Sequence, residues 1–199
     1  MNEIWQQILQ GASNSTPMEL IAVLFGLASV WYAKKENILV FPTGLINVGI
    51  YVYICATSRL YADMSINAYY FVMSIYGWVV WSSKDREDHY IPITNMILRE
   101  WVLYSIITIV SFFIMYFILI NYTDSDVPLW DSTTTAFFIV AMVLMARKKV
   151  EHWAAWIIGD IISIPLYLYK GLAFTSFQYL VFTAIAIGGW IEWRRKLAK

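Results

Sequence analysis

One carboxylate and two tryptophans share a face of a strongly apolar stretch near the end of the chain. The residues of that face are separated by three or four positions, which is the spacing of one side of a helix; they are Trp153, Trp156, Asp160, Ser163 and Tyr167. A buried carboxylate without a basic neighbour must take a proton, reach water or meet a cation. Tryptophan rings stack on flat rings and attract cations. The pattern therefore predicts a site for a flat, positively charged ring.

Amides and further tyrosines recur at helical spacing elsewhere. Asn47 precedes Tyr51 by four residues, Asn67 precedes Tyr70 by three, and Gln178 lies early in the last apolar segment. With Asp160 they would form an aromatic cage with amide donors and acceptors. Small polar residues also join membrane helices through hydrogen bonds, so a purely structural role stays open for Asn47, Asp160 and the serines.

The composition places this cage in a membrane. The chain has 199 residues, of which 60% are hydrophobic and only 14% charged, against roughly 25% charged in soluble domains. The formal net charge of zero argues against a nucleic-acid binder. One cysteine and two histidines leave metal sites short of ligands, and no nucleotide-binding or hydrolase motif occurs. We expect an integral membrane protein that is not an enzyme and needs no cofactor or metal.

Apolar runs long enough to approach the about 20 residues of a spanning helix occur seven times. They cover residues 19–33, 38–57, 62–81, 101–121, 132–146, 152–169 and 172–193. Thr16-Pro17-Met18-Glu19 reads as a capping box with proline at the first helical position. Before it, Ile4, Trp5, Ile8 and Leu9 suggest a short amphipathic helix in the membrane interface.

Lysine and arginine orient the predicted spans, because basic loops stay in the cytoplasm. Twelve of these residues fall in one set of loops and the C-terminal tail, and two, Arg59 and Lys170, fall in the other set. The loop at residues 121–131 carries three aspartates and no basic residue. We expect an outer N-terminus and a cytoplasmic C-terminus, with residues 84–89 as a solvated cytoplasmic loop.

An internal repeat accompanies this topology. Gly77-Trp78-Val79-Val80-Trp81 resembles Gly189-Trp190-Ile191-Glu192-Trp193 at an offset of 112, and Ala33-Lys34-Lys35 resembles Ala146-Arg147-Lys148 at an offset of 113, which would pair Asn47 with Asp160. The expected fold is all-α, with two parallel three-helix repeats joined by a linker helix. We divide it into an interfacial segment (1–18), a first repeat (19–100), a linker with outer loop (101–131) and a second repeat (132–199). Such paired repeats are typical of transporters.

Several ordered motifs give the chain a family resemblance from about residue 19 onward. They are Leu60-Tyr61-Ala62-Asp63, Ser74-Ile75-Tyr76-Gly77-Trp78, Trp130-Asp131-Ser132 and the stretch 156–172, WIIGDIISIPLYLYKGL. With these motifs the chain resembles the Pnu-type bacterial vitamin transporters, a family that includes nicotinamide riboside transporters.

The resemblance implies a seven-helix, three-plus-one-plus-three fold related to the SWEET sugar transporters, assembled as a homotrimer. It also implies a location in the bacterial inner membrane and facilitated diffusion, with a cytoplasmic kinase that traps the vitamin. Carried over by motif, the substrate contacts would be Trp153, Trp156, Asn67, Asn47, Tyr51 and Gln178. Two positions depart from the pattern: Asn67 stands where many relatives have glutamine, and Asp160 where some nicotinamide riboside carriers have asparagine.

The substrate stays open at this level. Nicotinamide riboside and thiamine both contain a fixed cationic ring and suit Asp160 with its tryptophans, and nicotinamide riboside is the first choice. Riboflavin is neutral and bulkier, and suits the cage less well. A receptor or structural subunit would need no polar cage, and an intramembrane enzyme would need a facing nucleophile and base, which the positions of His89 and His152 do not supply.

Overall fold

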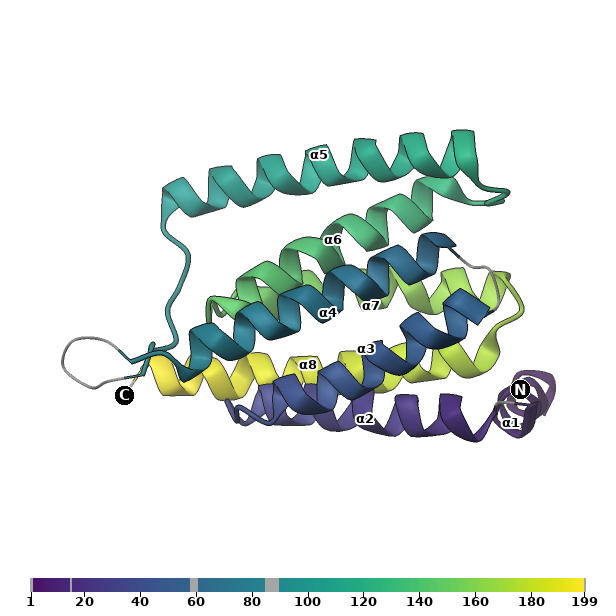
Figure 1. Cartoon of the computed structure of the whole chain (residues 1–199), viewed down its shortest axis with the longest axis horizontal. Helices are drawn as coiled ribbons and strands as arrows, with labels where there is room; N and C mark the ends of the chain where they lie inside the picture. Colours follow the sequence, from purple (N-terminus) through teal and green to yellow (C-terminus); the bar gives the residue numbers. More distant parts are fainter. Residues whose placement is uncertain (1, 15, 58–60, 85–89, 199) are drawn as a thin grey trace.

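Eight helices make up the protein in a computed structural model that describes residues 2–14, 16–57, 61–84 and 90–198 (Figure 1). The helices are α1 (Asn2–Asn14), α2 (Pro17–Lys34), α3 (Val40–Thr57), α4 (Tyr61–Ser82), α5 (Leu98–Tyr122), α6 (Pro128–Ala146), α7 (His152–Tyr169) and α8 (Ala173–Leu197). The all-helical class predicted from the sequence is confirmed. Of the residues used above, Arg59, Leu60, Arg86 and His89 lie outside the described part, as does most of the predicted 84–89 loop.

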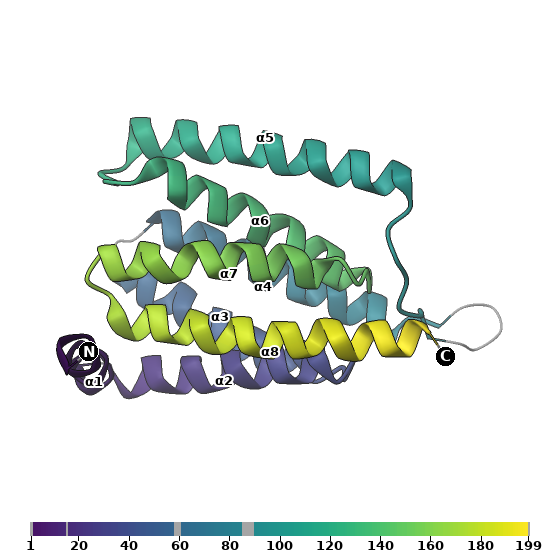
Figure 2. The ribbon, with the colours of Figure 1, turned by 180° about the vertical axis from the view of Figure 1, so that it is seen from behind.

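Five of these helices, α2, α3, α5, α6 and α8, are long and apolar enough to cross a membrane. The other two predicted spans, α4 and α7, are 22 and 18 residues long. They carry the polar and amphipathic residues of the predicted cage, among them Asn67, Tyr70 and Asp160. Both lie side by side with apolar helices in the bundle (Figures 1 and 2).

The start of α2 follows the local rule read from the sequence. Thr16 is the N-cap, and its hydroxyl accepts a hydrogen bond from the Glu19 amide at 3.2 Å. The Glu19 carboxylate accepts one from the Thr16 amide at 2.6 Å, and Pro17 occupies the first turn. Both otherwise unsatisfied amides are thereby paired. The predicted capping box is confirmed.

Helices α2 to α8 alternate in direction, so that chain-adjacent helices are antiparallel (Figures 1 and 2). Within the first set, α3 packs on α2 and α4; within the second, α7 packs on α6 and α8. The two sets meet where α2 packs on α8 and α4 packs on α6. Helix α5 packs on α6 at the outside of the bundle. The contacts thus link six helices in a closed ring, with α3 and α7 each in the middle of its set.

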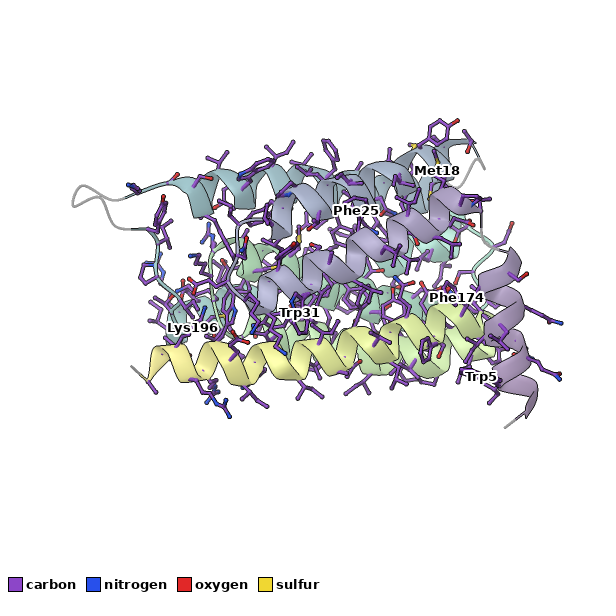
Figure 3. The ribbon with its side chains drawn as sticks, turned by 90° about the horizontal axis from the view of Figure 1, so that it is seen from below. Trp5, Met18, Phe25, Trp31, Phe174 and Lys196 are labelled. Carbon is purple, nitrogen blue, oxygen red and sulfur yellow. The ribbon has the colours of Figure 1, made fainter. Side chains whose placement is uncertain are left out.

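Helix α1 lies across the end of the bundle where α2 begins (Figure 3). Gly11 allows close approach to α8, since a Cβ there would stand 2.7 Å from Cβ of Phe174. Ile4, Trp5 and Leu9 leave about half of their surface exposed. An exposed apolar face on a helix placed at the bundle end fits the interfacial helix expected from the sequence.

The opposite end of the bundle gathers basic residues, and we call it the basic end. It comprises the end of α2, the α6–α7 loop and the end of α8, with Lys34, Lys35, Arg147, Lys148, Lys149, Arg194, Arg195 and Lys196. Four of the lysines form ion pairs: Lys35 with Glu192 at 3.4 Å, Lys149 with Glu100 at 2.8 Å, and Lys148 and Lys196 each with Glu36 at 2.9 Å.

The internal repeat has one offset in place of the two predicted. Helices α3 and α7 begin at Val40 and His152 and end at Thr57 and Tyr169, so both of their ends are related by the same offset of 112 that relates the two Gly-Trp motifs. The shift to 113 predicted for the earlier block, and with it the pairing of Asn47 with Asp160, is wrong. At the observed offset Asn47 corresponds to Gly159.

Candidate substrate site

Asp160 lies at the middle of α7, where its side chain is 3% exposed. No ion pair among the described residues involves it. Asp160 interacts electrostatically with the phenols of Tyr70 on α4 and Tyr179 on α8. The carboxyl group therefore lies near aromatic hydroxyls from two other helices.

Aromatic rings extend this group. Tyr179 stacks on Tyr167 with ring centroids 5.1 Å apart, and their hydroxyls are hydrogen-bonded. Phe138 of α6 stacks on Tyr179 at 6.0 Å and lies 5.3 Å from Trp156. We call this group the Asp160 cluster: Tyr70, Phe138, Trp156, Asp160, Tyr167 and Tyr179. Four helices contribute to it, from both halves of the bundle.

Gly159 leaves room for the Phe138 ring in the cluster. A Cβ at Gly159 would overlap the Phe138 ring. At the repeat offset the corresponding pair is Gly26 on α2 and Asn47 on α3, where the large and small partners are exchanged: a Cβ at Gly26 would stand 2.9 Å from the Asn47 amide nitrogen. Each repeat thus has one glycine facing one bulky residue, on opposite helices.

The two predicted site residues of α3 have different neighbours. Asn47 donates from its side-chain amide to the carbonyl of Ala22 at 2.6 Å, which ties α3 to α2. Tyr51, one turn further, interacts electrostatically with Tyr167 across the bundle. Asn67 on α4 is half-buried and precedes Tyr70 by about one helical turn. The structure thus brings Tyr51, Tyr70, Trp156 and Asp160 together and leaves the side-chain amide of Asn47 on a helix backbone.

Trp153 lies in a different layer. It is 1% exposed, two helical turns or about 10 Å along α7 from Asp160. Its ring contacts His152 at 4.4 Å and Trp193 at 5.9 Å, and a Cβ on Gly189 would overlap it. The predicted common face of α7 is present, but side chains of α8 hold Trp153 in the core of the basic end, apart from the Asp160 cluster.

Gln178 is also separate from the cluster. It lines a groove between α2 and α8 together with Leu20, Leu24 and Phe177. Its chain neighbour Tyr179 is the residue of α8 that stacks on Phe138. Adjacent positions on a helix point about 100° apart, so the two side chains face different neighbours.

Two cluster members, Phe138 and Tyr179, have no counterpart in the predicted site. Tyr167 shares the predicted Asp160 face but is not among the predicted site residues. The i, i+7 spacing from Asp160 to Tyr167 carries a signal for it. Phe138 could be found through the internal repeat. Residue 138 corresponds to Gly26 and residue 159 to Asn47, so the pair Phe138 and Gly159 is equivalent to the pair Gly26 and Asn47. No local pattern distinguishes Tyr179 from the other aromatic residues of α8.

The basic end is closed by pairs of residues that correspond in the two repeats. Trp81 donates from its indole to the carbonyl of Met145 at 3.2 Å, and Trp193 donates to that of Ala33 at 3.0 Å. The two donors are equivalent to each other at the repeat offset, and so are the two acceptors. The two indoles lie 6.0 Å from one another.

Phe41 and Trp153 continue this symmetry. Phe41 meets Trp81 edge-on at 5.1 Å, as Trp153 meets Trp193 at 5.9 Å. A Cβ on Gly77 would overlap Phe41, as one on Gly189 would overlap Trp153. Small residues at these two helix positions let the large rings fill the space between the repeats.

Chemically, the Asp160 cluster can hold a cation and stack a flat ring, because it combines one carboxylate with aromatic faces and hydroxyls. A buried, fixed cluster between two sets of helices is the arrangement expected of a transporter that binds its substrate near the membrane midplane.

Comparison with known proteins assigns the family. Residues 16–195 match the family described as "Nicotinamide mononucleotide transporter". The nicotinamide riboside transporter PnuC of Escherichia coli (strain K12) is 27% identical over 203 residues, covering 88% of this chain and 84% of that protein. PnuC of Neisseria mucosa is 26% identical over 187 residues, covering 88% and 71%. The riboflavin/roseoflavin transporter RibM of Streptomyces davaonensis is 37% identical over 68 residues, 32% of each chain.

A solved structure has the same fold. The crystal structure of the vitamin B3 transporter PnuC matches with a TM-score of 0.74 and 24% identity, covering 98% of this chain and 88% of that one. The family match spans nearly all of the helices described above. This protein belongs to the nicotinamide mononucleotide transporter family, and it is a multi-pass membrane transporter of a vitamin and not an enzyme.

Proposed function

We propose that the protein takes up nicotinamide riboside across the bacterial inner membrane. The observation that carries this proposal is Asp160, a buried carboxylate without an ion-pair partner in the described chain, set among aromatic rings. The nicotinamide ring of the riboside is flat and carries a fixed positive charge. Such a ring can stack on Trp156 or Tyr179 while its charge lies near Asp160.

The relatives favour nicotinamide riboside over riboflavin as the substrate. PnuC proteins similar over most of the chain are described as nicotinamide riboside transporters, while the riboflavin/roseoflavin transporter matches over about a third. Thiamine is the second candidate, because its thiazolium ring is also a fixed cation and its aminopyrimidine could donate to Asp160.

Within the site, we assign charge recognition to Asp160 and ring stacking to Trp156, Phe138 and Tyr179. Tyr51 and Tyr70 would contribute hydroxyls. Asn47 and Asn67 remain proposed polar contacts of the ribose, since each lies about one turn from one of these tyrosines. Trp153 and Gln178 lie apart from the cluster, and for them we propose packing in the basic end and in the α2–α8 groove.

For transport, we propose a three-plus-one-plus-three architecture in which α2–α4 and α6–α8 rock about the Asp160 cluster, with α5 as linker. The two sets are joined by contacts between equivalent residues: the indoles of Trp81 and Trp193 each donate a hydrogen bond to a carbonyl of the opposite set. These contacts support the proposal. The basic end would face the cytoplasm and the N-terminus the outside. Uptake would be facilitated diffusion, with a cytoplasmic kinase trapping the vitamin for NAD biosynthesis.

The basic end would then act as the cytoplasmic gate. Glu36 pairs with Lys148 and Lys196, and the Trp81–Trp193 layer lies beneath, so this end is closed. Release of the substrate into the cytoplasm would require these contacts to separate.

A homotrimer is the proposed assembly. Helix α5 presents an apolar outer face that includes Trp101, Ile109, Phe113 and Phe117, each 49–62% exposed. That face suits lipid or a further copy of the chain. The mass of the protein in detergent, measured by light scattering, decides between a monomer and a trimer.

Calorimetric binding of nicotinamide riboside and of thiamine to the purified protein in detergent tests the substrate. We expect heat of binding from nicotinamide riboside and little or none from thiamine. Tight binding of thiamine alone would replace the proposed substrate. Binding of neither would leave Asp160 as a structural residue.

A further inference from the structure

A groove follows the line where α2 meets α8 on the outside of the bundle (Figure 3). It consists of two neighbouring cavities of about 400 and 350 Å³, and Val181 lines both. Trp31 lies near its basic end and Phe174 near the other, as Figure 3 shows. Apart from Lys34 at one end and Gln178 at the other, the lining is aliphatic or aromatic.

The groove is long enough to hold an acyl chain of one leaflet. On α2 its lining runs from Leu20 to Lys34, which at 1.5 Å per residue is about 21 Å. Half of a hydrocarbon core about 30 Å thick is about 15 Å. An extended acyl chain that starts at the basic end can therefore lie within the groove.

A cation stands at the basic end of the groove. Lys34 is the last residue of α2. Its ammonium lies 4.7 Å from the centre of the Trp31 ring and 2.9 Å from the position that a Cβ of Gly188 would take. It therefore reaches across from α2 to α8. Within the described chain Lys34 forms no ion pair, in contrast to its neighbour Lys35, which pairs with Glu192.

We propose that this groove binds one anionic phospholipid, with its phosphate on Lys34 and one acyl chain between α2 and α8. Trp31, which is 48% exposed, would lie at the level of the glycerol, where tryptophan is enriched. Charge selects the ligand: a lysine near the membrane surface favours anionic over zwitterionic headgroups. A second copy of the chain is a poorer occupant, because an apolar partner surface would cover the Lys34 ammonium without pairing its charge, and the broad apolar face lies on α5.

The position of the groove gives the lipid a role. Helices α2 and α8 form one of the two contacts between the two sets of three helices. A lipid lodged along that contact would favour the conformation in which the two helices have this spacing. This consequence rests on the proposed rocking motion, whereas binding of the lipid does not.

Native mass spectrometry of the detergent-purified protein tests the site, with phosphatidylglycerol and phosphatidylcholine of equal chain length as probes. We expect the wild type to retain one phosphatidylglycerol about fivefold more than phosphatidylcholine. Lys34→Gln should remove this preference, while Arg195→Gln, which removes a charge from the same end outside the groove, should keep it. Ala184→Trp, which fills the groove, should lower retention of both lipids.

Three results would overturn the proposal. Equal losses in Lys34→Gln and Arg195→Gln would show diffuse attraction to a basic surface. Full retention in Ala184→Trp, or in Leu180→Trp should the first variant fail to fold, would place the lipid elsewhere. A change of oligomeric state in the groove-filling variants would make the groove an interface between copies. Vitamin binding by calorimetry is an independent readout, so failure of the lipid site leaves the transport proposal intact.

Discussion

Glu36 and Lys148 occupy equivalent positions in the two repeats, 112 residues apart, and form an ion pair with each other at 2.9 Å. Both have a left-handed backbone, with φ of 57° and 51°, in the short loops between α2 and α3 and between α6 and α7. Only residues close to the axis that relates the two repeats can contact their own equivalents. Together with Trp81 and Trp193, which also meet, this pair marks where that axis passes through the basic end.

Linking these two positions should stop transport. With Cys55→Ala as background, the variant Glu36→Cys/Lys148→Cys is joined in proteoliposomes by a short bis(methanethiosulfonate) reagent, which forms a disulfide with each thiol and releases methanesulfinate. We expect uptake to fall to background after linking and to return on reduction, because the basic end can no longer open. Each single cysteine variant treated in the same way is the control. Uptake that persists in the linked protein would exclude the basic end as a gate.

Glycines under the two rings of the basic end should tolerate no side chain. Gly77→Ala and Gly189→Ala would each overlap a ring, of Phe41 or Trp153, and we expect a loss of about 1–3 kcal/mol in stability. Gly49→Ala is the matched helical control, since its nearest contact would be Phe71 at 3.9 Å. Thermal unfolding in detergent measures all three. An unfolding temperature of Gly189→Ala equal to that of Gly49→Ala would contradict the close packing.

The pH dependence of the basic end follows from Glu36, which lies in the α2–α3 loop. Burial acts to raise its pKa, but hydrogen bonds from Lys148 and Lys196 and the attraction of their charges together outweigh burial and hold the pKa below its ordinary value. A carboxyl with a lowered pKa stabilises the fold above its unfolded pKa and loses that contribution as the pH falls through the folded value.

Glu36→Gln should therefore lower the unfolding temperature by a constant amount between about pH 6 and pH 8. In more acidic solution the difference from the wild type should shrink, because Glu36 itself becomes neutral. Unfolding curves of both proteins from about pH 8 down to about pH 3 measure the effect. A difference that grows toward acid pH would show that Glu36 is not stabilised as its charged form.

Much of the fold could be predicted from the sequence, because hydrophobic runs and caps are local signals. The predicted apolar runs fall within the observed helices almost to the residue, and Thr16 caps α2 as expected. The repeat is visible in Gly77-Trp78 and Gly189-Trp190, but local similarity around Lys34 suggests an offset that is too large by one. Hydrogen bonds from the indoles of Trp81 and Trp193 to the carbonyls of Met145 and Ala33 determine the offset, and these are long-range contacts that no local pattern contains.

The site could be predicted only in part for the same reason. Tyr70, Trp156 and Asp160 stand out by their residue type and helical spacing, and they meet in one cluster. Trp153 shares the Asp160 face of α7, but Gly189 on another helix gives its ring a place in the basic end. Gln178 and Tyr179 are adjacent in sequence, and only the packing of α8 decides which one turns toward α7.

Gly159 should matter to substrate binding through Phe138. A methyl group at Gly159→Ala would overlap the Phe138 ring, which also contacts Trp156 and Tyr179. We expect affinity for nicotinamide riboside to fall about tenfold, as displaced rings lose their stacking geometry. Phe138→Leu in the same chain should recover part of the loss by making room. If the double variant binds no better than Gly159→Ala, the effect does not act through Phe138.

Asp160→Asn separates charge from shape at the centre of the site. The substitution keeps the size of the side chain and removes its charge, so affinity for a cationic ligand should fall by about tenfold or more. The dihydro form of nicotinamide riboside has nearly the same size but an uncharged ring, and its affinity should change little. Calorimetry of both ligands against wild type and variant measures the difference. Equal losses for the two ligands would mean that Asp160 orders the tyrosines around it and does not select the positive ring.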